Sequence, residues 1–210
     1  GSQITALFRD KLGVTKATDV DAMPRQAIAA MAYGTETIVR VERIVGPGNA
    51  YVAAAKKLVS SDVAIDFVAG PSEIVIIASD GNPTWIAADM LAQAEHDVDA
   101  RAILITTSID LANKVQKELE KQMDSLPTAS VARVAIERNS AIVLCDSDDD
   151  AVALSNSIAP EHLSLYDETL VVGVTNAGSI FLGPFSPEAA GDYASGPNHI
   201  LPTSGVAAIR

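Results

Sequence analysis

Apolar and polar positions follow two different periods in turn along this chain. Short runs of apolar and β-branched residues, each the length of one strand, alternate with longer alanine-rich segments in which apolar positions recur at helical spacing. This alternation is typical of βα units that build a mostly parallel sheet, so the predicted fold class is α/β. The predicted strands are 41–45, 63–67, 73–78, 102–106, 141–145 and 179–182, and the predicted helices are 25–33, 50–59, 84–95, 109–123 and 148–158.

Glycine-proline turns follow several of the predicted strands, at 46–49, 70–73 and 183–184. Ligands bind at the carboxyl ends of the strands in a parallel sheet, so these turns are predicted ligand-facing loops, and 70–72 is also a candidate hinge. The segment 46–51 follows a strand and opens a helix, as a dinucleotide-binding fingerprint does, but Tyr51 stands where that pattern has its third glycine. The segment is interpreted either as a nucleotide-binding turn or as a tight βα turn.

Composition and charge restrict the class of protein. The 210 residues are 48% hydrophobic, enough for a substantial core, and the longest apolar runs are too short to span a membrane, so a cytoplasmic globular chain is expected. A net charge of -12 argues against nucleic acid and against an anionic membrane as partners. The acidic run 146–150 lacks the glycine and the closing glutamate of a calcium loop and predicts a solvated helix start. Cys145, the only cysteine, is predicted to be a buried strand residue without a chemical role.

The three histidines of the chain all lie beside carboxylate or amide side chains. His96, His162 and His199 occur in the sequences QAEH, APEHL and GPNH. Neutral imidazole binds metal ions and exchanges protons near neutral pH, so the three together indicate a zinc site or a proton-transfer site, although each alone could be an ordinary helix-end or loop residue. Gln93 and His96 lie three residues apart in a helical pattern, which predicts two ligands on one helical face.

Seven motifs together resemble those of the histidinol dehydrogenase family. The likeness runs from about Gln26 to Gly205 and rests on segments 32–36, 44–49, 69–73, 93–96, 158–163, 190–193 and 196–199. The resemblance implies two Rossmann-like lobes, a partial cofactor-side lobe at 1–72 and a second lobe at 73–210 that carries the zinc and acid-base residues. It also implies that the chain matches the central portion of a family member. The family's N-terminal region and C-terminal tail are expected to be absent, which leaves both lobes incomplete.

The family resemblance implies an activity and a set of cofactors. The family oxidises L-histidinol through an aldehyde to L-histidine, with NAD as oxidant, zinc bound at the site, and a tail that reaches into the partner subunit of a homodimer. Gln93, His96 and Asp192 match the family's zinc ligands, and these side chains are suited to zinc. With zinc as a template that orients the substrate, the implied substrate-binding residues are Ser72, Gln93, His96, His162 and Asp192.

The resemblance also assigns proton transfer and cofactor contacts. Glu161 and His162 match the acid-base pair, in which His162 takes the alcohol proton and Glu161 activates the water that adds to the aldehyde. Adjacent residues of a strand point to opposite faces, so the pair serves one site only if the bend at Pro160 redirects them. Gln26 and Asn49 match cofactor-contacting positions, while the segment 23–25 replaces a glycine-rich stretch of the family. His199 matches a family motif and is expected to support the pocket without being a ligand.

Two other classes of function remain open from the sequence. A related zinc and NAD dehydrogenase of another polar alcohol would keep the same zinc and base residues. A non-catalytic, truncated α/β relative would bind a nucleotide or a protein and would show no zinc dependence. Turnover of histidinol and stabilisation of the fold by zinc distinguish the three.

Overall fold

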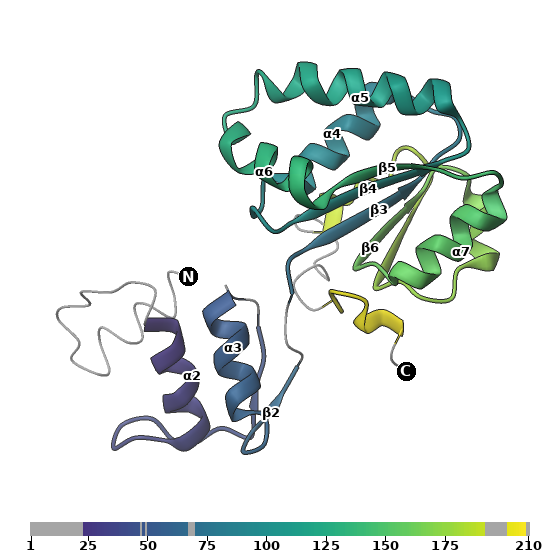
Figure 1. Ribbon diagram of the computed structural model, residues 1–210. Helices are drawn as coiled ribbons and strands as arrows, with labels where there is room; N and C mark the ends of the chain where they lie inside the picture. The colour runs from purple at the N-terminus through teal and green to yellow at the C-terminus, as the bar shows by residue number, and fades with distance from the viewer. Residues whose placement is uncertain (1–22, 47, 49, 67–69, 192–200, 209–210) are drawn as a thin grey trace. The chain divides into compact units, whose positions relative to one another are not determined.

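The computed structural model describes residues 23–46, 48, 50–66, 70–191 and 201–208, which form parts of two compact units (Figure 1). The first unit comprises residues 1–70 and the second comprises residues 71–210. The division falls within the Gly-Pro turn that begins at residue 70, and the sequence placed the domain boundary two residues later, after Ser72.

The first unit is a small α/β assembly of α2 (Met23–Tyr33), β1 (Arg43–Ile44), α3 (Ala50–Val59) and β2 (Ala64–Ile65). The two strands pair in parallel, and each is shorter than the strand that the sequence predicts for that segment. Its core consists of Ile28, Ala32, Ile44, Val59 and Val63, all buried. Gly34 ends α2 with a φ of +79°, which glycine adopts without strain, and its N–H donates to the carbonyl of Ala30.

The second unit is built on a five-stranded parallel sheet in the order β5-β4-β3-β6-β7. Its strands are β3 (Glu73–Ile77), β4 (Arg101–Thr106), β5 (Ala141–Leu144), β6 (His162–Leu165) and β7 (Ser179–Leu182). Its helices are α4 (Pro83–Ala94), α5 (Ile109–Met123), α6 (Ala129–Asn139), α7 (Asp148–Ile158), and the 3-10 turns η1 (Glu168–Gly173) and η4 (Val206–Ala208). The predicted α/β class with a parallel sheet is thereby confirmed.

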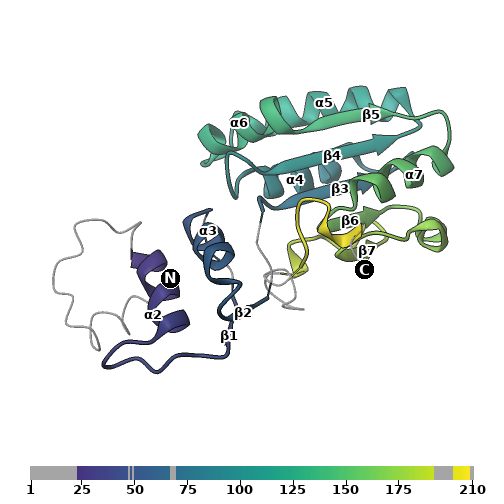
Figure 2. The same ribbon diagram turned by 60° about the horizontal axis from the view of Figure 1, so that its bottom comes forward.

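Helices cover both faces of this sheet. Figures 1 and 2 show α4, α5 and α6 on one face and α7 on the other. Side chains of β3 alternate between the two cores, with Ile74 and Ile76 packed under α4 to α6, and Val75 and Ile77 packed on the side of α7. All five residues of β3 are buried because the strand lies at the centre of the sheet with helices on both sides.

Local sequence signals predicted several elements at their observed bounds. The helices 50–59, 109–123 and 148–158 and the strand 179–182 agree with α3, α5, α7 and β7. The acidic run does open a helix, since Ser147 caps α7 and its hydroxyl accepts from the N–H of Asp150. Cys145 corrects the prediction of a buried strand residue, because it follows the edge strand β5 and is partly exposed.

One strand and one α-helix of the second unit were missed. The strand β6 is only four residues long, and its polar positions His162 and Ser164 conceal the apolar pattern of a buried strand. The helix α6 mixes three charged residues, Arg133, Glu137 and Arg138, with mostly alanine and valine, and it buries only Ala132 and Ala135. Among the described residues, no helix is both long enough and apolar enough to cross a membrane.

Candidate active site

A buried polar cluster lies at the amino-terminal end of the parallel sheet in the second unit. Glu73 opens β3 and His162 opens the neighbouring strand β6, with Ile74 paired in register with His162. His162 therefore projects from the same face of the sheet as Ile74, which is the face covered by α4. The residues predicted for catalysis thus lie at the opposite end of the sheet from the carboxyl ends, where open α/β folds usually bind ligands.

The imidazole of His162 is enclosed by side chains from α4, from β7 and from the segment after β7. It is 2% exposed, and its Nδ1 lies 3.4 Å from Oε1 of Gln93, in the last turn of α4. The ring of Phe181 on β7 lies on another side, with the two ring centroids 6.0 Å apart. Gln93 is itself 1% exposed, and among the described residues its Nε2 has no hydrogen-bond partner. An amide nitrogen buried in this way is costly, so Gln93 is a candidate for contact with a bound ligand.

Two carboxyl groups contact opposite nitrogens of the same imidazole. Oε1 of Glu161 lies 4.0 Å from Nε2 of His162, and Oε1 of Glu188 lies 3.4 Å from Nδ1. Both carboxyl groups are almost fully buried. Adjacent residues within a strand point to opposite faces of the sheet. Glu161 precedes β6 and does not lie within the strand, so its side chain and that of His162 both reach the same cluster. Ala159, in the left-handed conformation with a φ of +51°, ends α7 and turns the chain just before Pro160.

Hydrogen bonds hold the carboxylate of Glu161 in place. The backbone N–H of Glu73 donates to Oε2 of Glu161 at 3.2 Å, and the side chain of Ser72 also hydrogen-bonds this carboxylate. The carboxylate of Glu73 in turn accepts from the N–H of Ser204 at 3.0 Å and lies 3.8 Å from the guanidinium of Arg101. The cluster is thereby connected to the segment 201–208.

Burial dominates the electrostatics of this cluster. It raises the pKa of Glu161 to about 8, and the nearby carboxylates of Glu188 and Glu73 act in the same direction, against the N–H of Glu73 and the hydroxyl of Ser72. Burial also raises the pKa of Glu73, while the guanidinium of Arg101 lowers it. Glu161 is therefore protonated in the folded protein at neutral pH and becomes a base at mildly alkaline pH.

The raised pKa of Glu161 predicts that the fold loses stability as the pH rises. An unfolded glutamate releases its proton near its ordinary value of 4.5, whereas folded Glu161 holds it to about 8, so the stabilisation is complete below 4.5 and is lost between these values. The side chain of Glu161→Gln cannot ionise. Between pH 5 and pH 9, the free energy of unfolding, measured with urea, is expected to fall by about 1–3 kcal/mol less in this variant than in the wild type. The exposed Glu120→Gln is the control, and parallel pH profiles for wild type and Glu161→Gln would refute the assignment.

The proposed metal-binding residues at the end of α4 differ in exposure. α4 ends at Ala94, so Gln93 lies within the helix and His96 lies just beyond it, where its N–H donates to the carbonyl of Gln93 at 3.3 Å. His96 is exposed, and its Nδ1 lies 2.7 Å from the carbonyl oxygen of Ala92. A carbonyl accepts only from a protonated nitrogen, so Nδ1 carries the hydrogen and Nε2 is the nitrogen suited to a metal ion.

Several predicted site residues cannot be placed in this cluster. Asp192, His199 and Asn49 lie outside the described residues, and Gln26 is an exposed residue of α2 in the first unit. Within the described ranges, no group of three or more His, Cys, Asp or Glu side chains is arranged to hold a metal ion. Of the three proposed zinc ligands, the structure therefore describes Gln93 and His96 only.

The Gly-Pro turn after β1 is closed by internal contacts. The N–H of Gly46 donates to Oδ2 of Asp66 at 2.8 Å, and the buried ammonium of Lys56 donates to the carbonyl of Gly46 and pairs with Asp66. A Cβ at Gly48 would lie 2.5 Å from the side chain of Val52, so the helix start packs closely on the turn. The amide that a dinucleotide fingerprint would direct at a pyrophosphate is thus bonded to a carboxylate, which favours the tight βα turn.

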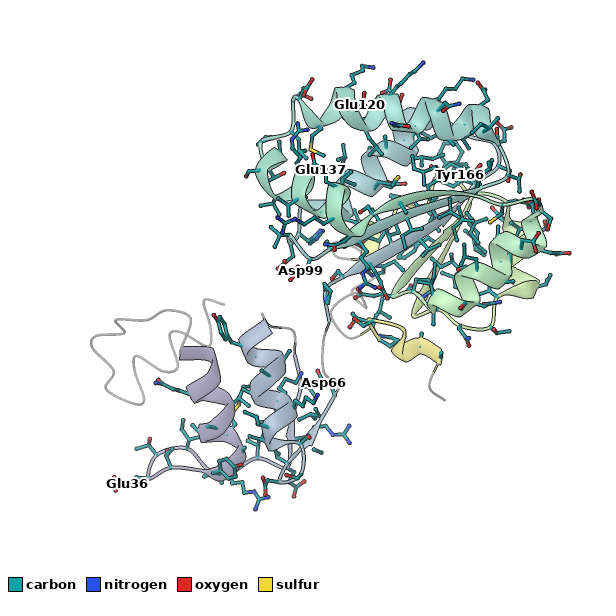
Figure 3. All side chains as sticks on the ribbon, viewed as in Figure 1. Glu36, Asp66, Asp99, Glu120, Glu137 and Tyr166 are labelled. Carbon is teal, nitrogen blue, oxygen red and sulfur yellow. The ribbon has the colours of Figure 1, made fainter. Side chains whose placement is uncertain are left out.

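A separate pocket lies at the carboxyl end of the sheet in the second unit. It has a volume of about 400 Å³ and includes Pro184 of the predicted ligand-facing turn 183–184. Figure 3 shows Tyr166, one of its lining residues, at this end of the sheet, and Asp99 at the opposite end, in the connection between α4 and β4. Three aspartates line this pocket, and each already caps a turn or bonds to a neighbouring side chain: Asp80, Asp148 and Asp167.

Sequence reasoning missed Glu73 and Glu188 as members of the cluster. Glu73 could have been noticed, because a carboxylate at the start of an otherwise apolar strand is unusual in a buried position. Glu188 lies in the irregular segment after β7 and no periodicity or spacing in the sequence connects it to His162. Its role in the cluster depends on the tertiary fold alone.

The sheet, its two helical layers and the buried histidine-carboxylate cluster define an α/β protein with a fold shared by known reductases and dehydrogenases. Two solved structures of low identity show this fold alone. γ-Glutamyl phosphate reductase from Thermotoga maritima has a TM-score of 0.51 at 8% identity and covers 91% of this chain and 53% of its own. NADP-dependent glyceraldehyde-3-phosphate dehydrogenase from Bacillus halodurans has a TM-score of 0.50 at 10% identity and covers 82% of this chain and 48% of its own.

The chain belongs to the histidinol dehydrogenase family, a family of oxidoreductases, and the model of that family matches residues 3–210. It is 59% identical over 186 residues to the histidinol dehydrogenase of Bacillus cereus and 54% identical over 187 residues to that of Methylococcus capsulatus. A crystal structure of histidinol dehydrogenase from Elizabethkingia anophelis matches with a TM-score of 0.82 at 49% identity. In each of the three cases the match covers 87% of this chain and 43% of the relative, so the chain spans less than half the length of these relatives.

Proposed function

We propose that this chain carries the acid-base centre of an NAD- and zinc-dependent L-histidinol dehydrogenase, which oxidises L-histidinol through histidinal to L-histidine. The observation that supports this most strongly is the buried imidazole of His162, which lies between the carboxyl groups of Glu161 and Glu188 and beside the amide of Gln93. The homodimer and the cytoplasmic location that the family implies belong to the same proposal.

The two chemical stages require two bases, and the cluster offers two. In the first stage, Nε2 of His162 accepts the hydroxyl proton of the alcohol, and NAD, when bound, would supply the acceptor for the hydride. In the second stage, the carboxylate of Glu161 removes a proton from the water that adds to the aldehyde. Ser72, which hydrogen-bonds Glu161, orients this carboxylate and lines the substrate pocket. The burial of both bases excludes bulk water and strengthens their interaction with a bound substrate.

The described residues fit a zinc ion at the end of α4. Gln93 places its carbonyl oxygen Oε1, the amide atom that can bind a metal ion, beside His162, and His96 bonds its Nδ1 to a backbone carbonyl as zinc-binding histidines do. With Asp192 as a third ligand, these residues would hold the metal, which when bound supplies a template that orients the imidazole and amine of histidinol. The NAD contacts proposed are Gln26 and Asn49, which match cofactor-contacting positions of the family, whereas the N–H of Gly46 is already bonded to Asp66.

The zinc proposal predicts that the metal stabilises the folded chain. Zinc at about 100 times its dissociation constant is expected to stabilise the fold by about 2.7 kcal/mol, because a ligand that binds only the folded form must raise its stability. Unfolding midpoints with zinc and with a chelator measure the effect. His96→Ala is expected to remove most of the zinc-dependent shift, whereas the neighbouring, exposed Asp99→Asn keeps it. A zinc-dependent shift of equal size in all three proteins would place the metal elsewhere.

The direct test of the function is formation of NADH. The purified chain is mixed with zinc, NAD and L-histidinol at mildly alkaline pH, and the absorbance of NADH is followed. Turnover of histidinol above that of other amino or sulfonated alcohols is the expected result. Preference for another polar alcohol would favour the related dehydrogenase, and the absence of both turnover and zinc stabilisation would favour the non-catalytic relative.

A further inference from the structure

Glu188 reaches His162 from a segment that runs back across the sheet. β7 pairs in parallel with β6 and carries the chain toward the carboxyl end, where the N–H of Gly183 donates to the carbonyl of Leu165. Five residues after Gly183, Oε1 of Glu188 lies 3.4 Å from Nδ1 of His162 at the amino end. The segment 183–188 therefore runs from the carboxyl end of the sheet back to its amino end, where the carboxyl group of Glu188 contacts the imidazole.

The backbone around Glu188 is organised to present its side chain. The N–H of Ala190 donates to the carbonyl of Pro187, and the N–H of Gly191 donates to the carbonyl of Glu188 at 2.8 Å, so two consecutive turns close at this position. The side chain of Glu188 is only 4% exposed. A charged group is rarely buried unless a partner stabilises it, and His162 is one such partner of Glu188.

A carboxylate at Nδ1 determines which imidazole nitrogen holds the hydrogen. A carboxylate oxygen accepts hydrogen bonds, so the contact of Oε1 of Glu188 with Nδ1 at 3.4 Å favours the hydrogen on Nδ1. The other neighbour of Nδ1, Gln93, could present either its carbonyl or its amino group and does not decide the tautomer by itself. With the hydrogen on Nδ1, the lone pair lies on Nε2, the nitrogen that faces Glu161.

We propose that Glu188 is a positioning residue that holds His162 in the Nδ1–H tautomer and thereby makes Nε2 the base. Only the use of that base in alcohol oxidation rests on the proposed function. The tautomer itself follows from the contact between Glu188 and His162. Carboxylate groups that orient a catalytic imidazole act in the same way in other enzymes, where they retain the correct tautomer without taking the proton themselves.

The tautomer can be measured directly by two-bond ¹H–¹⁵N correlation spectra of the imidazole of His162 at a fixed pH. The wild-type chain is expected to show the Nδ1–H pattern. In Glu188→Leu, which has no acceptor at this position, the ratio of Nδ1–H to Nε2–H is expected to fall about tenfold or more, since a charge-assisted hydrogen bond is lost. Glu188→Asp, which restores a carboxylate, is expected to recover most of the ratio. The exposed Glu137→Gln is the control.

The outcomes separate this proposal from the proposed function. An unchanged tautomer ratio in a folded Glu188→Leu variant would overturn the positioning role. If that variant does not fold, Glu188→Met, which keeps the length of the side chain and offers no oxygen acceptor, decides in the same way. In the NADH assay, Glu188→Leu is expected to lower kcat about 100-fold and to change KM for histidinol by less than about threefold. Absence of turnover in the wild-type chain would count against the proposed function and would leave the tautomer measurement intact.

Discussion

Replacing His162 with alanine is expected to lower the rate of NADH formation from L-histidinol by about 1000-fold. The imidazole is the group placed to accept the hydroxyl proton, and general-base catalysis contributes about 10²–10⁴-fold to such reactions. The substitution leaves Glu161 and Glu188 without the ring that lies between them, and no neighbouring residue of the cluster is shown to replace its Nε2. Initial rates at saturating histidinol and NAD measure the effect.

The matched control for His162→Ala is Phe181→Leu. The ring of Phe181 packs near the imidazole with centroids 6.0 Å apart, so this change disturbs packing and retains the base. It is expected to alter the rate by less than about threefold. Far-UV circular dichroism shows whether each variant is folded. More than a tenth of the wild-type rate in folded His162→Ala would show that another group is the base.

Replacing Glu161 with glutamine is expected to separate the two oxidations. Glutamine still offers an oxygen to the N–H of Glu73, so the local structure is retained, but it cannot take a proton from water. The first oxidation, in which His162 is the base, continues, while the second oxidation is slowed about 100-fold or more. The yield of NADH per histidinol is then expected to fall from two toward one, with histidinal accumulating.

The pH dependence of the second oxidation gives an independent test of Glu161. Only the ionised carboxylate can act as a base, and burial raises its pKa to about 8, so the rate of this step in the wild-type chain is expected to rise with pH through that value. Glu161→Gln should lack this rise. The exposed Glu120→Gln should keep both the rise and the yield of two NADH. A yield of two at the wild-type rate in Glu161→Gln would exclude Glu161 as the second base.

The sequence was most informative where local interactions decide the structure. α5 was predicted at its observed bounds because its apolar periodicity is strong and Ser108 caps its first turn. β6 was missed because a four-residue strand gives little periodicity and because its first residue, His162, is polar. His162 is buried because α4, β7 and the segment after β7 all pack around it. These segments are distant in the sequence, so no local pattern predicts their contact with His162.

The features of the site likewise fall into those that the sequence predicts and those that depend on the tertiary structure. The sequence by itself determined the α/β class, most of the elements, the family motifs and the residues with suitable chemistry, since these depend on side-chain type and short-range spacing. Only the tertiary structure decided that the cluster lies at the amino end of the sheet, that Glu73 and Glu188 belong to it, and that Glu161 holds its proton at neutral pH. Burial and through-space distance are set by the packing of distant segments, so these properties exist only in the folded chain.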